Sequence, residues 1–196
     1  AMVISPLIAL MQDQVESLKK AGIKATFINS SMPNYDIEYT QDTLNDYKLV
    51  YIAPERLAVP NFMLALKTSQ ISFFVVDEAH CISQWGHSFR PEYRNLSLLK
   101  QEFADKPVSA FTATATKSVA KDITKQLLLK KPQSILGSFD RPNLTLRIER
   151  KYDWKSQLLA FLARHKEKSG IIYTTTRKKT DDIHAILLKH GLNVGK

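Results

Sequence analysis

The sequence predicts an α/β fold built on a parallel sheet, and two observations support this prediction. Short apolar segments alternate with longer amphipathic segments over most of the 196 residues, a pattern typical of parallel strands joined by helices. The segment 71–76 (ISFFVV) is largely apolar without regular polar alternation, which indicates a strand buried on both faces. A hydrophobic fraction of 44% agrees with a folded globular protein.

The first part of the chain supplies most of the predicted sheet. We expect a strand at 2–4 and then a helix that begins at Ser5-Pro6, as N-cap and first-turn proline, and ends at Gly22. Further strands are predicted at 25–28, 48–53, 71–76 and 108–111. Helices are predicted between them and after them, at 34–46, 61–67, 92–103 and 117–130.

The segment 137–143 (GSFDRPN) carries turn residues and a proline, and it reads as a linker. After it we expect strands at 144–148 and 170–174 and helices at 154–165 and 177–190. The sequence therefore predicts one nearly complete domain at 1–140 and the start of a second at 141–196. The first predicted strand lacks its beginning, so we expect a chain cut from something longer.

Composition narrows the class of protein. A single cysteine, Cys81, excludes an intrachain disulfide and fits a reducing cytoplasm. No apolar run is long enough for a bilayer and no signal peptide is recognisable. The net charge is +9, and residues 151–196 hold 10 Lys and Arg against 4 Asp and Glu. This basic character favours an anionic partner, or it simply keeps a surface soluble; composition leaves both open.

Two adjacent acids follow the predicted strand at 71–76. Asp77 and Glu78 would lie at the carboxyl end of a parallel strand, where ligands bind in such sheets. One carboxylate could hold magnesium with a nucleotide while the other activates a water; the alternative is a solvated acidic turn. A phosphate-binding loop of the form G-x-x-x-x-G-K-[ST] does not occur in the sequence. We therefore expect half of any nucleotide site to lie upstream of Met2.

Hydroxyl groups gather at predicted strand-to-helix turns. Ser5 could bind a phosphate of a nucleic-acid backbone or act as a plain N-cap. Thr112 and Thr114, which we expect close to the acids, could likewise contact nucleic acid or act only as local caps. We expect Thr116 to cap the next helix. The turn with Thr174, Thr176 and Arg177 repeats this arrangement in the second part.

The loop at 84–91 places Trp85, His87, Phe89 and Arg90 close to the acids. Aromatic and guanidinium groups can stack on unpaired bases, although Trp85 and Phe89 could instead be core residues. A zinc site made from His80, Cys81 and His87 is a third reading, but no fourth ligand is nearby in sequence.

Together these segments resemble the RecQ family of ATP-dependent DNA helicases, within helicase superfamily two. The motifs that carry the resemblance are VISPLIALMQDQV (3–15), YIAPERL (51–57), DEAHCISQWGHSFRPEY (77–93), FTATAT (111–116), SFDRPNL (138–144) and SGIIYTTTRK (169–178). The resemblance implies RecA-like lobes of the P-loop NTPase type, the first nearly complete and the second only begun. These lobes would use ATP and Mg²⁺ to move 3′ to 5′ on single-stranded DNA and unwind partly duplex DNA in recombination and repair.

The resemblance also implies roles for single residues. Asp77 would hold magnesium, Glu78 would activate water, and His80 and Gln84 would relay the nucleotide state towards DNA. Residues implied to contact or sense DNA, or to couple it to hydrolysis, are Ser5, Pro54, Arg56, Trp85, His87, Phe89, Arg90, Thr112, Thr114, Thr174 and Arg177. Family members often have cysteine and serine at the positions of Thr174 and Thr176, which weakens the implied contacts there.

The family's phosphate loop, arginine finger, zinc-binding region and winged-helix region have no counterpart in the sequence. We therefore expect the 196-residue chain alone neither to turn over ATP nor to unwind DNA, and we expect no zinc site in it. Two alternatives stay open: an RNA helicase of the broader superfamily, and a module that only binds nucleic acid or other proteins. The family resemblance implies a location in the cytoplasm or nucleoid of a bacterium, away from membranes.

Overall fold

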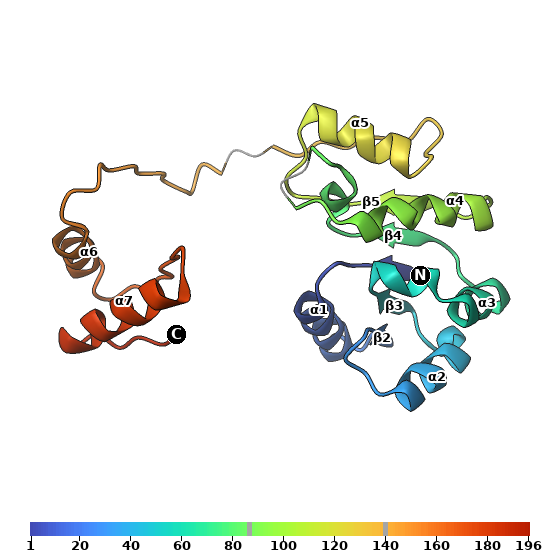
Figure 1. Cartoon of the computed structure of the whole chain (residues 1–196), viewed down its shortest axis with the longest axis horizontal. Coiled ribbons are helices and arrows are strands. Elements are labelled where there is room, and N and C mark those ends of the chain that lie inside the picture. Colours follow the sequence, from blue (N-terminus) through green and yellow to red (C-terminus); the bar gives the residue numbers. More distant parts are fainter. Residues whose placement is uncertain (86–87, 139–140) are drawn as a thin grey trace. The chain divides into compact units, whose positions relative to one another are not determined.

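The computed structural model describes residues 1–85, 88–138 and 141–196. The chain divides into two compact units, Ala1–Leu136 and Gly137–Lys196, which are considered separately (Figure 1). The division falls at the start of the segment predicted as a linker. The assignment of 1–140 and 141–196 to two helicase lobes stays a prediction.

A five-stranded parallel sheet forms the centre of the first unit, which confirms the predicted fold class. Its strands are β1 (Met2–Ile4), β2 (Ala25–Ile28), β3 (Leu49–Ile52), β4 (Phe74–Val76) and β5 (Val108–Ala110). The spatial order is β2-β3-β1-β4-β5, with parallel pairing between neighbours (Figure 1). Such short strands depend on burial from both sides, and β1 is buried along its whole length.

The strand register defines one edge of the sheet at which polar residues meet. The last residues of the five strands, in spatial order Ile28, Ile52, Ile4, Val76 and Ala110, are paired in register. The residues that follow them form what we call the carboxyl-edge row: Asn29, Ala53, Ser5, Asp77 and Phe111. Since the strands are parallel, the turns that leave this row all emerge on the same edge.

Five α-helices and four 3₁₀ segments connect the strands in the described part of the first unit. The helices are α1 (Ile8–Lys20), α2 (Asn34–Asp42), α3 (Pro60–Thr68), α4 (Leu98–Glu102) and α5 (Lys117–Gln126). The 3₁₀ segments are η1 (Leu44–Asp46), η2 (Pro54–Ala58), η3 (Ala79–Ile82) and η4 (Pro91–Ser97). As predicted, Gly22 closes α1: it follows the C-cap residue Ala21, and its φ of 77° suits glycine after a helix.

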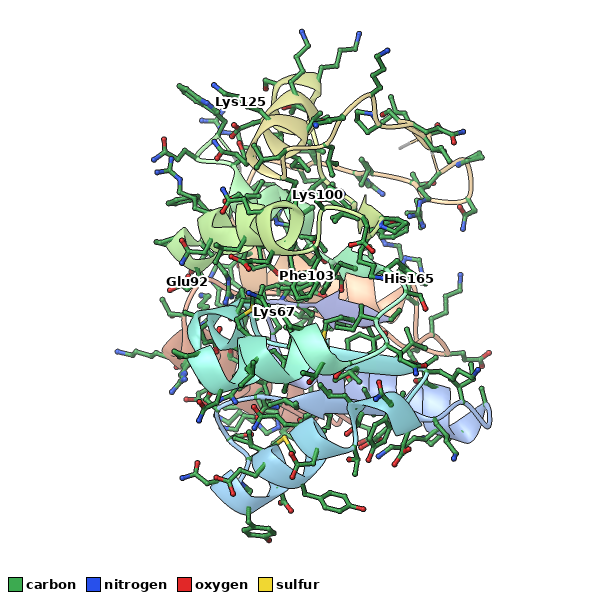
Figure 2. All side chains as sticks on the ribbon, turned by 90° about the vertical axis from the view of Figure 1, so that its right-hand side faces the viewer. Lys67, Glu92, Lys100, Phe103, Lys125 and His165 are labelled. Atoms are coloured by element: carbon green, nitrogen blue, oxygen red, sulfur yellow. The ribbon has the colours of Figure 1, made fainter. Side chains whose placement is uncertain are left out.

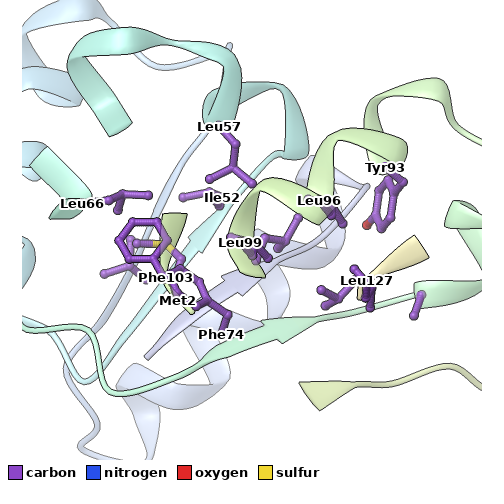
Figure 3. Packing of buried hydrophobic residues seen from close by; sticks show 14 of the residues in the cluster. Met2, Ile52, Leu57, Leu66, Phe74, Tyr93, Leu96, Leu99, Phe103 and Leu127 are labelled. Atoms are coloured by element: carbon purple, nitrogen blue, oxygen red, sulfur yellow. The ribbon is translucent and has the colours of Figure 1, made fainter. Parts of the chain in front are cut away.

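Alternating side chains of the strands enter two hydrophobic clusters. Val3 packs with Met11 and Val15 of α1 in the smaller cluster. Met2 and Ile4 point into the larger cluster, which also takes side chains from α3, η4, α4 and α5. Members drawn in Figure 3 are Ile52, Leu57, Leu66, Phe74, Tyr93, Leu96, Leu99, Phe103 and Leu127. The Phe74 and Phe103 rings have centroids 5.0 Å apart at 51°, a tilted aromatic pair.

The surface of this unit is rich in charge. Lys67 of α3, labelled in Figure 2, forms an ion pair with Glu102 of α4. Lys125 extends from α5 into solvent (Figure 2). An exposed ion pair of this kind contributes about 0–1 kcal/mol, so the hydrophobic clusters dominate stability. In the described ranges no helix is both long and apolar enough to cross a membrane.

Several predicted elements of the first unit differ in detail. The helix predicted at 34–46 is α2 followed by η1, and the helix predicted at 117–130 ends at Gln126. The helix predicted at 92–103 is η4 followed by the short α4. Its buried side chains Tyr93, Leu96 and Leu99 recur every three residues, which matches the three residues per turn of a 3₁₀ helix. The strand predicted at 71–76 is paired only from Phe74, and Phe73 is partly exposed.

The second unit contains α6 (Trp154–Ala163) and α7 (Arg177–Lys189), close to the predicted helices. The strands predicted at 144–148 and 170–174 are wrong for this structure, because neither segment is a strand. Their apolar side chains are open to solvent; Leu146 is 94% and Tyr173 88% exposed. A strand is stabilised by a paired neighbour and a packed face, and these segments have neither among the described residues.

Candidate nucleotide and nucleic-acid site

Asp77 is held in the carboxyl-edge row by contacts from three sides. Its backbone N–H donates to the Ile4 carbonyl of β1 at 2.9 Å, and its carbonyl accepts from the Tyr93 hydroxyl at 3.1 Å. Its side-chain Oδ1 accepts the Glu78 N–H at 2.9 Å. Asp77 lies at the end of β4, as predicted, and the Glu78 N–H orients its carboxylate.

Glu78 adopts a left-handed backbone conformation, with φ 47° and ψ 44°. This conformation is uncommon for a residue other than glycine, asparagine or aspartate, and such residues concentrate at functional sites. The Glu78 carboxylate lies 3.2 Å from His80 Nδ1, and its side chain remains about one-third exposed, at 34%. Glu78 is therefore positioned by His80 and still accessible to a water molecule.

His80 connects the acids to the end of β5. Its side chain is buried, and Nδ1 lies 2.9 Å from the Thr112 hydroxyl as well as near Glu78. Because a carboxylate can only accept, a favourable contact with Glu78 requires the proton on Nδ1. Thr112 Oγ1 also accepts the Thr114 N–H at 3.3 Å. The structure thus brings together four predicted residues: Glu78, His80, Thr112 and Thr114.

Arg90 connects its own segment to the turn between β1 and α1. Its Nη1 donates to the Pro6 carbonyl at 2.9 Å, and its backbone N–H donates to the Cys81 carbonyl at 2.9 Å. Tyr93 N–H in turn donates to the Arg90 carbonyl at 3.0 Å. Arg90 therefore links the segment after β1 with the segment after β4, which the sequence alone did not indicate.

The aromatic residues of the loop are not both core residues. The Trp85 side chain is 81% exposed, and the Trp85 backbone N–H donates to the Ser83 hydroxyl at 3.2 Å. Gln84 is exposed and Phe89 half-buried; the Phe89 ring lies 5.3 Å from the Arg94 guanidinium. His87 lies outside the described residues. The reading of Trp85 as a core residue is wrong for this structure, because its indole faces solvent.

Pro54 and Arg56 form the turn after β3. Pro54 is buried in the first turn of η2, and the Arg56 guanidinium lies 5.5 Å from the centroid of the Phe62 ring. Burial lowers the pKa of Arg56, opposed by the nearby carboxylate of Glu55. Arginine stays protonated at any ordinary pH, so the structure holds a partly desolvated cation at this edge of the sheet.

Ser5 does not cap α1, which corrects the predicted helix start. The helix begins at Ile8 after Leu7, and no side chain caps it. The Ser5 N–H instead donates to the Ile52 carbonyl at 3.0 Å, which extends the pairing of β1 with β3. Its side chain is fully buried, and Oγ has no hydrogen-bond partner among the described residues. A direct phosphate contact by Ser5 stays a prediction, one that this burial does not favour.

Two of the remaining predicted hydroxyls, those of Thr116 and Thr176, cap helices. Thr116 Oγ1 accepts the Val119 N–H at 3.3 Å and caps α5, as predicted. In the second unit, Thr176 caps α7 by accepting the Lys179 N–H. Thr174 Oγ1 lies 2.6 Å from the Thr180 hydroxyl, and Arg177 is the exposed first residue of α7.

Cys81 is buried beside His80, with Sγ 3.8 Å from Nε2. Burial raises the pKa of its thiol; Arg90 opposes this shift, whereas Glu78 and Asp77 increase it. The thiol therefore stays protonated at neutral pH. Within the ranges that the structure describes, no three His, Cys, Asp or Glu side chains gather to hold a metal.

Sequence reasoning missed two residues of this edge. Tyr93 is fully buried and its hydroxyl donates to the Asp77 carbonyl, although its place at the start of the helix predicted at 92–103 gave no sign of this contact. Asn29 is fully buried in the carboxyl-edge row after β2, and its Oδ1 accepts two hydrogen bonds from Ser31. A polar residue directly after an apolar strand was the available signal for Asn29.

Comparison with known proteins places this geometry in a family. A sequence profile described as DEAD/DEAH box helicase matches residues 1–123. The ATP-dependent DNA helicase RecQ of Haemophilus influenzae is 44% identical over 194 residues, 98% of this chain and 31% of that protein. The RecQ helicase of Bacillus subtilis is 43% identical over 197 residues, 99% of this chain and 33% of that protein.

A eukaryotic relative extends this similarity. The mouse ATP-dependent DNA helicase Q1 is 36% identical over 208 residues, 99% of this chain and 32% of that protein. The chain thus spans about a third of the length of these relatives. The resemblance to RecQ helicases is confirmed over nearly the whole chain. From the profile match, together with the acids at the end of β4, the chain belongs to the DEAD/DEAH box helicase family.

Proposed function

We propose that this chain is part of an ATP-dependent DNA helicase of the RecQ type. The intact protein would couple ATP hydrolysis to 3′–5′ movement on single-stranded DNA and to unwinding in recombination and repair. The observation that carries the proposal is the position of His80, which contacts both Glu78 and Thr112. The buried side chain of His80 thereby connects Glu78, one of the two adjacent acids, with the Thr112 hydroxyl that follows the neighbouring strand β5.

Asp77 and Glu78 are suited to a magnesium-nucleotide site. Mg²⁺ prefers one or two carboxylates together with substrate phosphates, and these two adjacent carboxylates are such a set. Asp77, oriented by the Glu78 N–H, would hold Mg²⁺ with ATP, directly or through water. The bound ion would neutralise phosphate charge. Glu78, partly exposed, would accept a proton from the attacking water while His80 keeps its carboxylate in place.

The neighbouring residues suit a coupling role. A change at Glu78 would reach Thr112 through the shared His80 Nδ1 and would reach Thr114 through the Thr112 hydroxyl. Exposed Gln84 lies two residues beyond η3, the segment that carries His80. We assign His80 and Gln84 to the relay between nucleotide and DNA on this basis.

The exposed loop supports contact with unpaired bases. The Trp85 indole is 81% exposed, so its apolar surface is in contact with water. A base stacked on the indole would cover this surface and contribute about 1–3 kcal/mol to binding. Phe89 and Arg90 would shape the same surface, since Arg90 ties the loop to Pro6. His87 belongs to this proposed surface by sequence. Thr174 and Arg177 would contribute the DNA-facing turn of the second unit.

The decisive experiment measures ATP hydrolysis by the longer protein that contains this chain. We expect single-stranded DNA to stimulate hydrolysis, and Glu78→Gln to abolish it while ATP still binds. Glu38→Gln, which changes an exposed acid of α2, is the matched control and should leave hydrolysis unchanged. Stimulation by RNA rather than DNA would favour an RNA helicase. Full DNA-stimulated hydrolysis in Glu78→Gln would refute the proposed role of the acids.

The 196-residue chain alone is proposed to be inactive as an ATPase, since its sequence contains no phosphate-binding loop. DNA-stimulated phosphate release by the purified chain would contradict this. We propose a cytoplasmic or nucleoid location in a bacterium, supported by the single cysteine and by the two bacterial relatives that carry the RecQ name.

A further inference from the structure

A hollow of about 330 Å³ lies at the amino edge of the sheet, where β2 and β3 begin. Its lining comes from the end of α1, the turn that follows, the start of β2 and the segment before β3: Lys19, Gly22, Ile23, Lys24, Ala25 and Tyr47. Because the strands are parallel, this edge is opposite the carboxyl-edge row and the acids that follow β4. The hollow is therefore separate from the candidate nucleotide site.

The turn after α1 gives the hollow a fixed wall. The Gly22 N–H donates to the Lys19 carbonyl at 3.0 Å, and the Ile23 N–H donates to the Leu18 carbonyl at 2.9 Å. These two hydrogen bonds are those of a Schellman motif at a helix end. A Cβ built at Gly22 would meet no atom within 4 Å, and Ile23 is 37% exposed. The turn therefore presents an apolar side chain beside open space.

Four exposed lysines line the hollow or are adjacent in the chain to its lining: Lys19, Lys20, Lys24 and Lys48. None of them forms an ion pair with a described residue. Lys19 and Lys20 complement the negative end of the α1 dipole, whereas Lys24 and Lys48 lie outside helices. The Lys48 N–H donates to the Lys24 carbonyl at 2.8 Å, so these two lysines are neighbours across the sheet. Like charges in such positions are destabilising, which indicates an anionic ligand.

The lysine-rimmed hollow, as we call this surface, combines two kinds of chemistry. Ile23, Ala25 and the ring of Tyr47 offer an apolar wall, and aromatic residues are enriched at protein interfaces. The segments 16–25 and 45–49 carry four lysines against two acids, a net charge of +2. A nucleic-acid backbone would satisfy the lysines and leave the apolar wall uncovered. An acidic peptide with one apolar side chain would satisfy both.

We propose that the lysine-rimmed hollow binds an acidic peptide segment of a partner protein. One apolar side chain of the segment packs against Ile23 and Tyr47, and the carboxylates on either side of it lie near the lysines. The volume is at the small end of the range for ligand pockets, about 300–1,000 Å³, which suits one anchoring side chain. Because the hollow is at the opposite edge from the proposed nucleotide and DNA contacts, this inference goes beyond the proposed function and does not depend on it.

The test uses the 196-residue chain and a fluorescein-labelled nonapeptide with acidic residues on both sides of one phenylalanine. Binding is followed by anisotropy from low to high salt. A second peptide has serine in place of the phenylalanine and so lacks the apolar anchor. We expect the phenylalanine peptide to bind about fivefold more tightly than the serine peptide, because its ring is covered on binding. The affinity of both peptides should fall as salt screens the exposed charges.

Two variants separate the charged rim from the apolar wall. Lys24→Glu should weaken binding of both peptides about fivefold at low salt, which is about 1 kcal/mol. Lys125→Glu makes the same change in net charge on exposed α5 and should bind as wild type does. Ile23→Ala should weaken binding of the phenylalanine peptide about threefold and leave the serine peptide unchanged. Leu64→Ala removes an equally large side chain that is 64% exposed on α3 and should have no effect.

Thermal unfolding checks that each variant is folded. The proposal is refuted if the wild-type chain binds neither peptide at low salt, or if folded Lys24→Glu and Ile23→Ala bind as wild type does. If Lys24→Glu weakens binding of a single-stranded oligonucleotide as much as binding of the peptides, the lysines form a nucleic-acid surface and the proposal is wrong. Self-association of the wild-type chain that Lys24→Glu abolishes in sedimentation experiments would assign the hollow to a second copy, and this would equally overturn the proposal.

Discussion

Replacement of Tyr93 by phenylalanine tests how much the hydrogen bond from the Tyr93 hydroxyl to the Asp77 carbonyl contributes to stability. Tyr93 is fully buried, and its hydroxyl donates to the Asp77 carbonyl at 3.1 Å. Tyr93→Phe keeps the ring in the larger cluster and removes only this hydrogen bond, so no large cavity forms. A lost hydrogen bond that leaves a buried carbonyl unsatisfied costs about 1–1.5 kcal/mol. We expect the free energy of unfolding at pH 7 to fall by about that amount.

The same residue predicts how stability changes in alkali. Burial raises the pKa of the Tyr93 phenol, and negative charge on Cys81 and Asp77 raises it further. The folded-state pKa therefore lies above the unfolded value of about 10. This contribution to stability is complete below pH 10 and declines as pH rises, by about 1.4 kcal/mol for each pH unit above 10. Tyr93→Phe lacks this contribution, so the two stability curves should cross near pH 11.

Urea unfolding of the 196-residue chain, followed by circular dichroism between pH 7 and pH 11, measures both effects. Tyr35→Phe is the matched control, because Tyr35 is 71% exposed on α2, and we expect it to follow the wild type throughout. Equal stability of Tyr93→Phe and wild type at pH 7 would refute the hydrogen-bond argument. A constant difference between the two up to pH 11 would refute the argument from the raised pKa.

Three further predictions follow from single contacts. Thr116→Ala removes the cap of α5 and should lower the free energy of unfolding by about 1 kcal/mol in urea titrations, without shifting DNA binding. Trp85→Ala removes an exposed indole and should weaken single-stranded DNA binding by about 1–3 kcal/mol with unchanged thermal stability; unchanged anisotropy titrations would contradict the stacking role. In the longer protein, Thr112→Val breaks the contact with His80 and should reduce DNA-stimulated more than basal ATP hydrolysis; equal reduction of both rates would contradict the coupling role.

Local signals in the sequence account for much of the first unit. The apolar runs predicted the strands, Gly22 predicted the end of α1, and Thr116 predicted the cap of α5, because each depends on residues close in the chain. The position of Asp77 followed from the strand that precedes it. The 3₁₀ form of η4 was missed, since buried residues spaced by three also occur on α-helices.

Features that depend on distant partners were not predictable in this way. Ser5 reads as an N-cap by composition, yet pairing with Ile52 takes its backbone into the sheet. The segments at 144–148 and 170–174 have strand-like composition, but a strand exists only when another strand and a covering layer are present. The link from Arg90 to Pro6 spans 84 residues. No local pattern encodes such a contact.

The backbone at Glu78 explains why the site has this form. A left-handed conformation at a residue other than glycine costs about 1–2 kcal/mol. Backbone hydrogen bonds from the residues on either side of Glu78 hold this turn in place. Asp77 N–H donates towards β1, whereas Ala79 N–H donates to the Phe111 carbonyl after β5 at 2.8 Å. The chain therefore changes its partner from one neighbouring strand to the other within two residues. This reversal brings His80 beside Thr112. Glycine would relieve the strain but would remove the carboxylate, so the strain at Glu78 is the cost of keeping an acid between the two strands.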